Sequence, residues 1–381
     1  MNRRSRGYAP QPIITKINTE GIFAAGAELS NSFCIGKGKQ AIMSQYLGDL
    51  KNAETLEFYE ETYQRFEQLF RFKPKLIAMD LHPDYLSSQF AQKLSENHQI
   101  PILKIQHHHA HIASVMATHQ LDEDVIGIGF DGIGLGKDRN IWGAEFMTAN
   151  LNDYNRMYHF EYIPLPGGDK VSKEPWRMAI SYLYKVFGED FTNLDLPILK
   201  EIESSKVQNI TQMIQKKLNT PLASSAGRLF DAIASIIGVC HFNSFQAEAP
   251  MRLESIINDQ IKESYDCEIQ KESISFNIMI RQIVSDCMQG ISRSVIATKF
   301  HNTIIELVVK ICVEISVKLD INKIVLSGGS FQNAYLTENI ENRLKINDLE
   351  VYLPKAVPVN DQGIALGQLV IAAKRRELSK I

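Results

Sequence analysis

Four of the chain's ten histidines lie within residues 107–111, where their spacing could support metal chemistry. If this stretch is helical, His107 and His111 are four residues apart and share one face, while His108 and His109 point elsewhere. Two neutral imidazoles on one face can bind a single zinc, iron, nickel or copper ion. The glutamate of the HExxH pattern is absent, so a zinc peptidase is not indicated. The alternative is a polar, solvated start of a helix.

A metal site of this kind also needs a carboxylate, and two aspartates are candidates. Asp131 follows an apolar run at 125–130 that predicts a strand, and Asp361 precedes the last predicted helix at 362–374. Both lie where a strand or a loop would meet a cleft, so we expect them near the histidines. Spacing along the chain does not by itself select them.

Two glycine-rich segments could bind phosphate. In segment 130–137, Gly132 and Gly134 punctuate a turn between two predicted strands, where backbone amides can form an anion-binding nest. In segment 325–333, a buried strand runs into Gly328 and Gly329 and then into a helix, whose N-terminus favours negative charge. The second segment is not GxGxxG, so a dinucleotide fold is disfavoured. The alternative for each is a tight turn that requires positive φ.

Two polar loops between apolar runs could also bind a ligand. The candidate residues are Lys170, Lys173 and Arg177 in the first loop and Gly227, Arg228 and Asp231 in the second. Serines before the second group can cap the helix that follows. The alternative for both loops is solvated charge combined with helix capping.

The elements that must position these residues come in two similar sets. The first set has predicted strands at 22–27, 32–35, 40–44, 76–79 and 102–105, with helices at 53–72 and 83–96. The second set has predicted strands at 125–130, 141–147, 156–163, 323–326 and 350–353, with helices between 175 and 319, at 331–344 and at 362–374. Residues 22–48 and 125–147 look like one unit used twice, which predicts a two-lobed α/β protein with a cleft. Residues 189–290 break this pattern and are expected to form a helical insertion.

Composition limits the class of protein. The 381 residues are 44% hydrophobic and 22% charged, as in ordinary globular proteins. No apolar run approaches the length of a membrane span, and no secretory signal begins the chain. The net charge of −3 makes nucleic acid an unlikely partner. Five scattered cysteines without a CxxC pair suit a reducing compartment, so we expect a cytoplasmic protein.

Residues from about 3 to 375 resemble the C-terminal half of HypF-type carbamoyltransferases. The segments that carry the resemblance are RRSRGYAP, GAELSNSFC, QYLGDL, DLHPDYLSS, QHHHAHIASVMA, FDGIGLGKD, WGAEF, LPGGDKVSKEPWRMA, GRLFDA, LSGGSFQN and NDQGIALGQ. The resemblance implies a two-lobed fold of the actin, Hsp70 and sugar-kinase (ASKHA) type, with duplicated RNase H-like lobes. We therefore expect a remnant of a YrdC-like domain at 1–20, a first lobe at 21–121, and a second lobe at 122–381 that contains the insertion.

The resemblance also implies a chemistry. In this family a YrdC-like domain, in cis or in trans, makes carbamoyl-adenylate from carbamoyl phosphate and ATP. The half seen here passes the carbamoyl group to the C-terminal cysteine of a HypE-type acceptor protein during NiFe hydrogenase maturation. The implied cofactors are a divalent metal (iron or zinc), Mg and ATP or carbamoyl-adenylate.

The motifs assign roles to individual residues. The metal-binding and catalytic set is His107, His111, Asp131 and Asp361. The nucleotide-binding set is Gly132, Gly134, Gly227, Arg228, Asp231, Gly328, Gly329 and Asn333. The substrate-binding set is Lys170, Lys173 and Arg177.

This chain also departs from the family's pattern. The acylphosphatase domain, the zinc-finger pairs and nearly all of the YrdC-like domain are absent, and RRSRGYAP resembles that domain's final strand. Ser30, Tyr46, Lys173 and Gln362 replace the usual Lys, His, Arg and Gly. Three alternatives therefore stay open: TsaD-like transfer to tRNA, small-molecule O-carbamoyl transfer, and an inactive nucleotide-binding module that docks a maturation partner.

Overall fold

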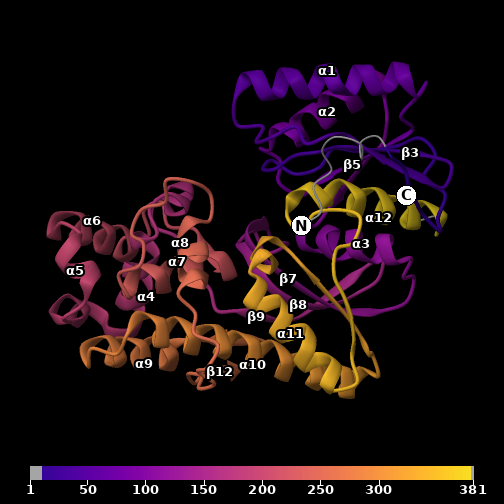
Figure 1. The fold of residues 1–381 in the computed structure, drawn as a ribbon. Helices are drawn as coiled ribbons and strands as arrows, with labels where there is room; N and C mark the ends of the chain where they lie inside the picture. Colours follow the sequence, from indigo (N-terminus) through magenta and orange to yellow (C-terminus); the bar gives the residue numbers. More distant parts are fainter. Residues whose placement is uncertain (1–10, 379–381) are drawn as a thin grey trace.

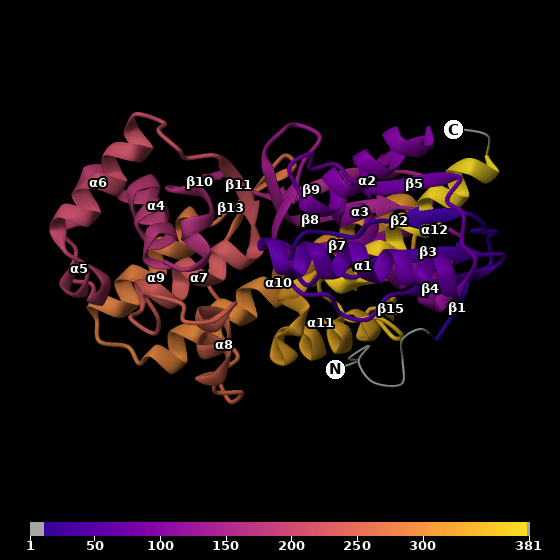
Figure 2. The ribbon, with the colours of Figure 1, turned by 90° about the horizontal axis from the view of Figure 1, so that it is seen from above.

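The computed structural model describes residues 11–378 of the chain. Two β-sheets with their helices form two lobes, and a mostly helical region extends from the second lobe (Figures 1 and 2). The expected YrdC-like strand at 3–10 lies outside the described residues. Within them, no helix is long and apolar enough to cross a membrane.

The first lobe is built on a six-stranded sheet with the strand order β1-β4-β3-β2-β5-β6. Its strands are β1 (Ile13–Ile14), β2 (Ile22–Ala24), β3 (Cys34–Lys37), β4 (Gln40–Met43), β5 (Leu76–Asp80) and β6 (Ile102–Ile105). β2, β3 and β4 form an antiparallel meander, and β5 and β6 continue it in parallel. β1 belongs to the segment 1–20, and it pairs with β4 as an edge of this sheet.

The second lobe repeats this topology in a nine-stranded sheet. Its strands are β7 (Val125–Leu135), β8 (Ile141–Ala149), β9 (Tyr154–Phe160), β10 (Ile163–Pro164), β11 (Leu222–Ser225), β12 (Glu268–Gln270), β13 (Ser273–Ser275), β14 (Lys323–Ser327) and β15 (Glu350–Tyr352). The order β9-β8-β7-β14-β15 matches β4-β3-β2-β5-β6 in the first sheet. The duplicated two-lobed α/β fold expected from the sequence is therefore confirmed.

Helices α1 (Ala53–Leu69) and α2 (Leu86–His98) cover the outer face of the first sheet, and α12 (Ile364–Glu377) covers its inner face. Helix α3 (His107–His119) packs between α12 and the second sheet, against β7 and β14. Apolar residues of α3 and α12 share one buried core with β2 and β7 (Figure 1). The backbones of α3 and α12 meet at Gly367, where an added Cβ would lie 1.8 Å from the carbonyl oxygen of Ala110. Helix α12 is thereby fixed between the two sheets, next to the histidine helix α3.

The remaining helices cover the second sheet and build the region beside it (Figure 2). They are α4 (Trp176–Phe187), α5 (Pro197–Glu201), α6 (Ser204–Gln215), α7 (Ala226–Ile236), α8 (Glu248–Ser255), α9 (Asn277–Met288), α10 (Arg293–Leu319) and α11 (Ala334–Ile346). The expected insertion at 189–290 is not wholly helical. β11 pairs with β8 and β13 pairs with β9, so parts of this segment extend the second sheet.

The first glycine-rich segment differs from its prediction. We expected a strand ending at residue 130 and a turn at Gly132 and Gly134, but β7 continues to Leu135. Its pairing with β8 is irregular between Phe130 and Gly134, and the turn falls at residues 136–140. A bulge of this kind bends the strand and changes the direction of its side chains, while the hydrogen-bonded pairing of the two strands continues on both sides of it. Asp131 lies in this bulge.

Candidate metal and nucleotide site

The histidine cluster begins helix α3 directly after strand β6. Gln106 is the N-cap, and its side-chain oxygen accepts a hydrogen bond from the backbone N–H of His109 at 2.9 Å. The helix therefore starts at His107, and one helical turn brings the rings of His107 and His111 to a centroid separation of 5.0 Å. Both side chains are buried. The predicted shared face is present.

The tertiary structure brings two aspartates to this face. Asp131 Oδ2 lies 3.4 Å from the Nε2 atoms of both histidines. Asp361 Oδ1 lies 3.7 Å from Nε2 of His107 and 3.5 Å from Nε2 of His111. One ligand atom from each of the four residues therefore lies within 4.8 Å of the other three.

This donor set fits a divalent cation. Ligand atoms about 2.1 Å from a tetrahedral metal stand about 3.4 Å apart, close to the separations observed here. Two imidazoles and two carboxylates suit zinc or iron(II). Nε2 of His111 is buried and faces the carboxylate oxygens of Asp131 and Asp361 at 3.4 and 3.5 Å, as expected for a nitrogen that could bind a metal beside them.

A fifth residue, Asp80, supports the cluster and was missed in the sequence. It ends strand β5, and its Oδ2 accepts a hydrogen bond from Nδ1–H of His107 at 2.9 Å. Its Oδ1 accepts from the backbone N–H of His82, so both carboxylate oxygens are fixed. This hydrogen bond orients Nε2 of His107 toward Asp131 and Asp361, a common support for metal-binding histidines. The sequence feature that could have indicated Asp80 is its position as an acidic residue at the end of a fully buried strand.

The charges within the cluster balance one another. Burial alone would lower the pKa of His107, but the charge of Asp361 and hydrogen bonds to the neighbouring aspartates raise it well above its ordinary value. Burial alone would raise the pKa of Asp131, but hydrogen bonds to His107 and His111 hold it well below its ordinary value. The positive imidazoles and negative carboxylates of the cluster thus stabilise one another, and a bound cation would take the place of the imidazole protons.

The two other histidines of the cluster serve different contacts. Nε2–H of His109 donates to the carbonyl oxygen of Asn150 at 2.7 Å. The ring of His108 packs against β7, where a Cβ added at Gly134 would lie 2.5 Å from its Cε1 atom. Gly134, predicted to bind nucleotide, therefore makes room for a histidine ring.

The second glycine segment lies directly beside the metal cluster. Gly328 has φ of 104°, and an added Cβ would lie 2.2 Å from the carbonyl oxygen of Phe130. A Cβ on Gly329 would lie 3.0 Å from Asp131 Oδ1. The turn therefore needs two glycines, one for its backbone conformation and one for its closeness to a metal ligand.

The predicted residues of the second polar loop also meet this region. A Cβ on Gly227 would lie 3.3 Å from Cα of Gly132, so α7 begins against the bulge of β7. Asp231 is fully buried on α7 and forms an ion pair with Arg228 at 2.9 Å. Burial raises the pKa of Asp231 to about 6, although the charge of Arg228 opposes this. Neither carboxylate oxygen has a hydrogen bond of good geometry among the described residues, and both are buried.

Asn333 lies near this turn, but its side chain already has partners. Its Oδ1 accepts a hydrogen bond from the backbone N–H of Leu336 at 2.8 Å and caps helix α11. Its Nδ2 donates to Nε2 of His301 at 3.0 Å. Since α11 begins at Ala334 and not at 331, Asn333 is not one helical turn beyond Gly329. Its role in nucleotide binding stays a prediction.

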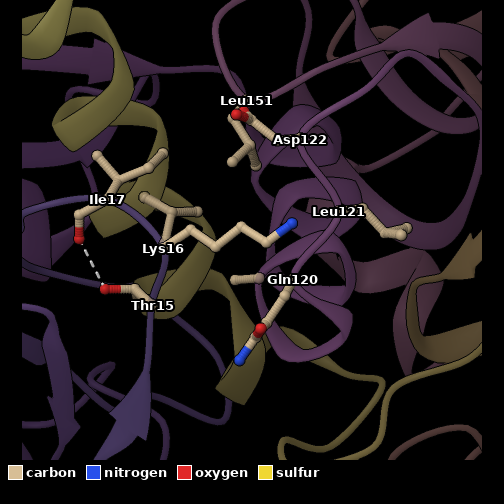
Figure 3. Close-up of a pocket in the computed structure, with 9 residues that line it drawn as sticks. Thr15, Lys16, Ile17, Gln120, Leu121, Asp122 and Leu151 are labelled. Atoms are coloured by element: carbon tan, nitrogen blue, oxygen red, sulfur yellow. Dashed lines mark hydrogen bonds between the residues drawn. The ribbon is translucent and has the colours of Figure 1, made fainter.

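The three predicted substrate-binding cations lie apart from the metal. Lys170 and Arg177 line a cavity of about 320 Å³, and Lys173 does not. No residue of the metal or nucleotide sets lines this cavity. A second hollow, lined by Lys16, Gln120 and Asp122, encloses only about 10 Å³ and has room for about one water (Figure 3).

The departures from the family's pattern occupy different environments. The side chain of Ser32 donates to the backbone oxygen of Gln362, which links the first lobe to the loop of Asp361. The side-chain nitrogen of Gln362 is buried and has no hydrogen-bond partner among residues 11–378. Ser30 has φ of 44° and donates its backbone N–H to Asp49, while Tyr46 is half exposed.

Comparisons with known proteins agree with this geometry. Residues 18–118 match the family described as HypF Kae1-like domain, and residues 127–368 match the second subdomain of the Kae1-like carbamoyltransferase domain. A carbamoyltransferase HypF of Synechocystis is 36% identical, over 98% of this chain and 50% of its own length. A HypF homolog of Cupriavidus necator is 31% identical, over 93% of this chain and 92% of its own length.

Two solved structures share the fold over 99% of this chain. A full-length HypF in the phosphate- and nucleotide-bound form is 42% identical, with a TM-score of 0.93 over 59% of that protein. The HypF of T. kodakarensis is 31% identical, with a TM-score of 0.91 over 50% of that protein.

The chain with these duplicated lobes, the histidine–aspartate cluster and the glycine turn beside it matches Kae1-like domains of the carbamoyltransferase class. The chain belongs to the HypF family of carbamoyltransferases. It spans about half the length of most of the curated relatives it matches.

Proposed function

We propose that this chain transfers a carbamoyl group from carbamoyl-adenylate to the thiol of a HypE-type acceptor in NiFe hydrogenase maturation. The closeness of the glycine turn to the metal cluster supports this most directly. Because Gly329 lies against Asp131, a phosphate held on the turn would lie next to a metal held by the four ligands. The related HypF with bound phosphate and nucleotide supports a nucleotide ligand for this fold.

Each part of the site has a distinct task in this proposal. His107, His111, Asp131 and Asp361 would hold the divalent ion, which supplies Lewis-acid polarisation of a carbonyl when bound. The backbone N–H of Gly329 would orient the phosphate without reorganisation, because its dipole is fixed by the fold. The backbone N–H of Gly328 donates to the carbonyl oxygen of Val359 and holds the turn in place. Asp231, which is ion-paired with Arg228, would support the nucleotide side of the site from below the bulge of β7. Asp80 keeps His107 in the tautomer that binds metal.

A reconstituted reaction tests this function. The chain would receive either carbamoyl-adenylate or a separate YrdC-type enzyme with carbamoyl phosphate and ATP, plus a HypE-type protein with its C-terminal cysteine. Mass spectrometry should then show a carbamoyl group on that cysteine, and no transfer by the His107→Ala variant. Nucleotide binding without transfer to any thiol would overturn the enzymatic role and favour a nucleotide-binding docking module.

A second assay tests the division of labour between domains. We expect the chain alone to catalyse no carbamoyl-phosphate-dependent exchange of pyrophosphate into ATP, because this activation belongs to the YrdC-like domain in the family. Adding such a domain in trans should restore exchange. Rapid exchange by the chain alone would contradict the two-stage scheme.

A further inference from the structure

Tyr85 stands at the start of helix α2, in a position that tyrosine seldom occupies. It is the N-cap residue, but its side chain makes no capping hydrogen bond. Serine, threonine, aspartate and asparagine are usual there, because their side chains accept from the free N–H groups of the first turn. Here Oε2 of Glu28 accepts instead from the backbone N–H of Leu86 at 2.7 Å. Because another residue makes up for the missing cap, we expect the side chain of Tyr85 to serve a different purpose.

The ring of Tyr85 is held against the residues that support the metal cluster. It stacks on the imidazole of His82, with a centroid separation of 4.2 Å and an angle of 3° between the two planes. The backbone N–H of His82 donates to Oδ1 of Asp80 at 2.9 Å. Oδ2 of Asp80 in turn accepts from Nδ1–H of His107 at 2.9 Å. A short chain of contacts therefore joins the tyrosine ring to a metal-binding histidine.

The hydroxyl of Tyr85 lies beside the cluster and has no partner there. The strongest charges that act on it are those of Asp80, His107, Asp361 and Asp131. Both oxygens of Asp80 already accept hydrogen bonds, and the Tyr85 hydroxyl has no hydrogen-bond partner among residues 11–378. The residue is partly exposed, and its oxygen is open to solvent. A phenolic O–H is thus available to a molecule bound at the cluster.

This phenol can act as a hydrogen-bond donor. A tyrosine of ordinary pKa is already protonated at neutral pH. Burial, and then the negative charge of Asp80, raise the pKa of Tyr85 further. A neutral, fixed O–H group is suited to an oxygen on which negative charge develops during a reaction, because its dipole is oriented before the charge appears.

We propose that Tyr85 is a further catalytic residue, whose hydroxyl donates a hydrogen bond to the carbonyl oxygen of the carbamoyl group during transfer. This inference rests on the proposed function. In the transfer step the acceptor thiol has lost its proton to solvent, and its sulfur forms a bond to the carbamoyl carbon. The bond from that carbon to the phosphate oxygen breaks, and AMP leaves with the electron pair. Negative charge develops on the carbonyl oxygen as the sulfur attacks, and Tyr85 stabilises it while keeping its own proton.

The reconstituted transfer reaction tests this role with Tyr85→Phe, which keeps the stacked ring and removes only the hydroxyl. We expect kcat to fall roughly 100-fold, because one donor to the developing charge is lost. The KM for the acceptor should change less than about twofold, since the hydrogen bond strengthens only in the transition state. Tyr184→Phe is the matched control and should transfer like the wild type. Tyr184 is also partly exposed and its ring also contacts another ring, that of Phe191, but it lies on α4.

Three further measurements separate this role from the alternatives. Bound metal, ATP affinity and the midpoint of thermal unfolding should be the same in Tyr85→Phe and the wild type. Loss of metal from Tyr85→Phe would make Tyr85 a metal ligand and overturn the donor role. Unchanged kcat, or a higher KM for the acceptor at unchanged kcat, would overturn it as well. An absence of transfer by the wild type would instead refute the proposed function, and this inference with it.

Discussion

The pKa values of two buried aspartates, Asp131 and Asp231, are shifted in opposite directions. Hydrogen bonds to His107 and His111 hold the pKa of Asp131 far below its ordinary value against the effect of burial. In Asp231, burial prevails over the charge of Arg228, and the pKa rises to about 6. Both are aspartates near one cleft, and they differ in how many cationic partners the chain provides.

The two aspartates therefore belong to sites of different kinds. In one site the polar side chains are paired with one another, and in the other several polar atoms lack hydrogen-bond partners within the described residues. In the metal cluster, four side chains converge and a fifth, Asp80, fixes their orientation. Around Asp231, the carboxylate oxygens and part of the Arg228 guanidinium lack hydrogen-bond partners among the described residues. We therefore expect substitutions in the cluster to act on metal binding, and substitutions near Asp231 to act on nucleotide binding and stability.

The largest effect should come from removing one of the two imidazole ligands. His107→Ala or His111→Ala should reduce bound metal from one ion per chain to none, because a single imidazole then remains and zinc or iron(II) loses a preferred nitrogen ligand. Elemental analysis of the purified protein measures this. His119→Ala, on the same helix but outside the cluster, is the control and should retain the ion. Stoichiometric metal in the double variant would refute the assignment.

Asp80→Asn should weaken metal binding without abolishing it. Loss of the carboxylate that orients a metal-binding histidine typically costs about 10- to 100-fold in affinity. Competition with a chelator measures this change, and the unfolding midpoint of the metal-free protein shows whether the fold is intact. Affinity equal to that of the wild type would mean that Asp80 only packs against His107.

Gly329→Val should weaken nucleotide binding by about 10-fold or more, because a branched side chain fills the space beside Asp131. Calorimetry with ATP measures the affinity. Gly329→Ala should have a smaller effect, so the two variants form a graded series. If both bind ATP like the wild type, the segment is a structural turn. If they lose metal as well, the substitution acts through Asp131.

The smallest effect concerns stability and pH. Asp231 binds its proton more tightly in the folded chain, where its pKa is about 6, than in the unfolded chain, where it is near 3.8. Its ionisation therefore opposes folding, with no contribution below pH 3.8 and the full cost above pH 6. Between those limits the wild type should lose about 3 kcal/mol relative to Asp231→Asn, since each pKa unit is worth about 1.4 kcal/mol.

Thermal unfolding at pH 4 and pH 7.5 measures this difference as a shift of a few degrees between the two proteins. Asp190→Asn, at an exposed position, is the control and should follow the wild type at both pH values. Parallel pH profiles for wild type and Asp231→Asn would show that Asp231 is ionised without cost, contrary to the contrast with Asp131.

The sequence alone determined the features that depend on local geometry. The spacing of His107 and His111 places them on one helical face wherever that helix lies, because a turn holds 3.6 residues. The alternation and punctuation of apolar runs predicted the repeated strand pattern, which both sheets confirm. The Gly328–Gly329 turn was also visible, because positive φ and close approach both require glycine.

Only the tertiary structure decided which distant residues meet. Asp80, Asp131 and Asp361 come from two different sheets and the loop before the last helix, and no local periodicity relates them to the histidines. The bulge in β7, the capping role of Asn333 and the separation of Lys173 from the cavity likewise depend on the packing of several elements. Local sequence preferences determine the conformation of a segment. Burial and strand pairing between residues hundreds of positions apart determine which segments lie next to each other, and this site is formed by such neighbours.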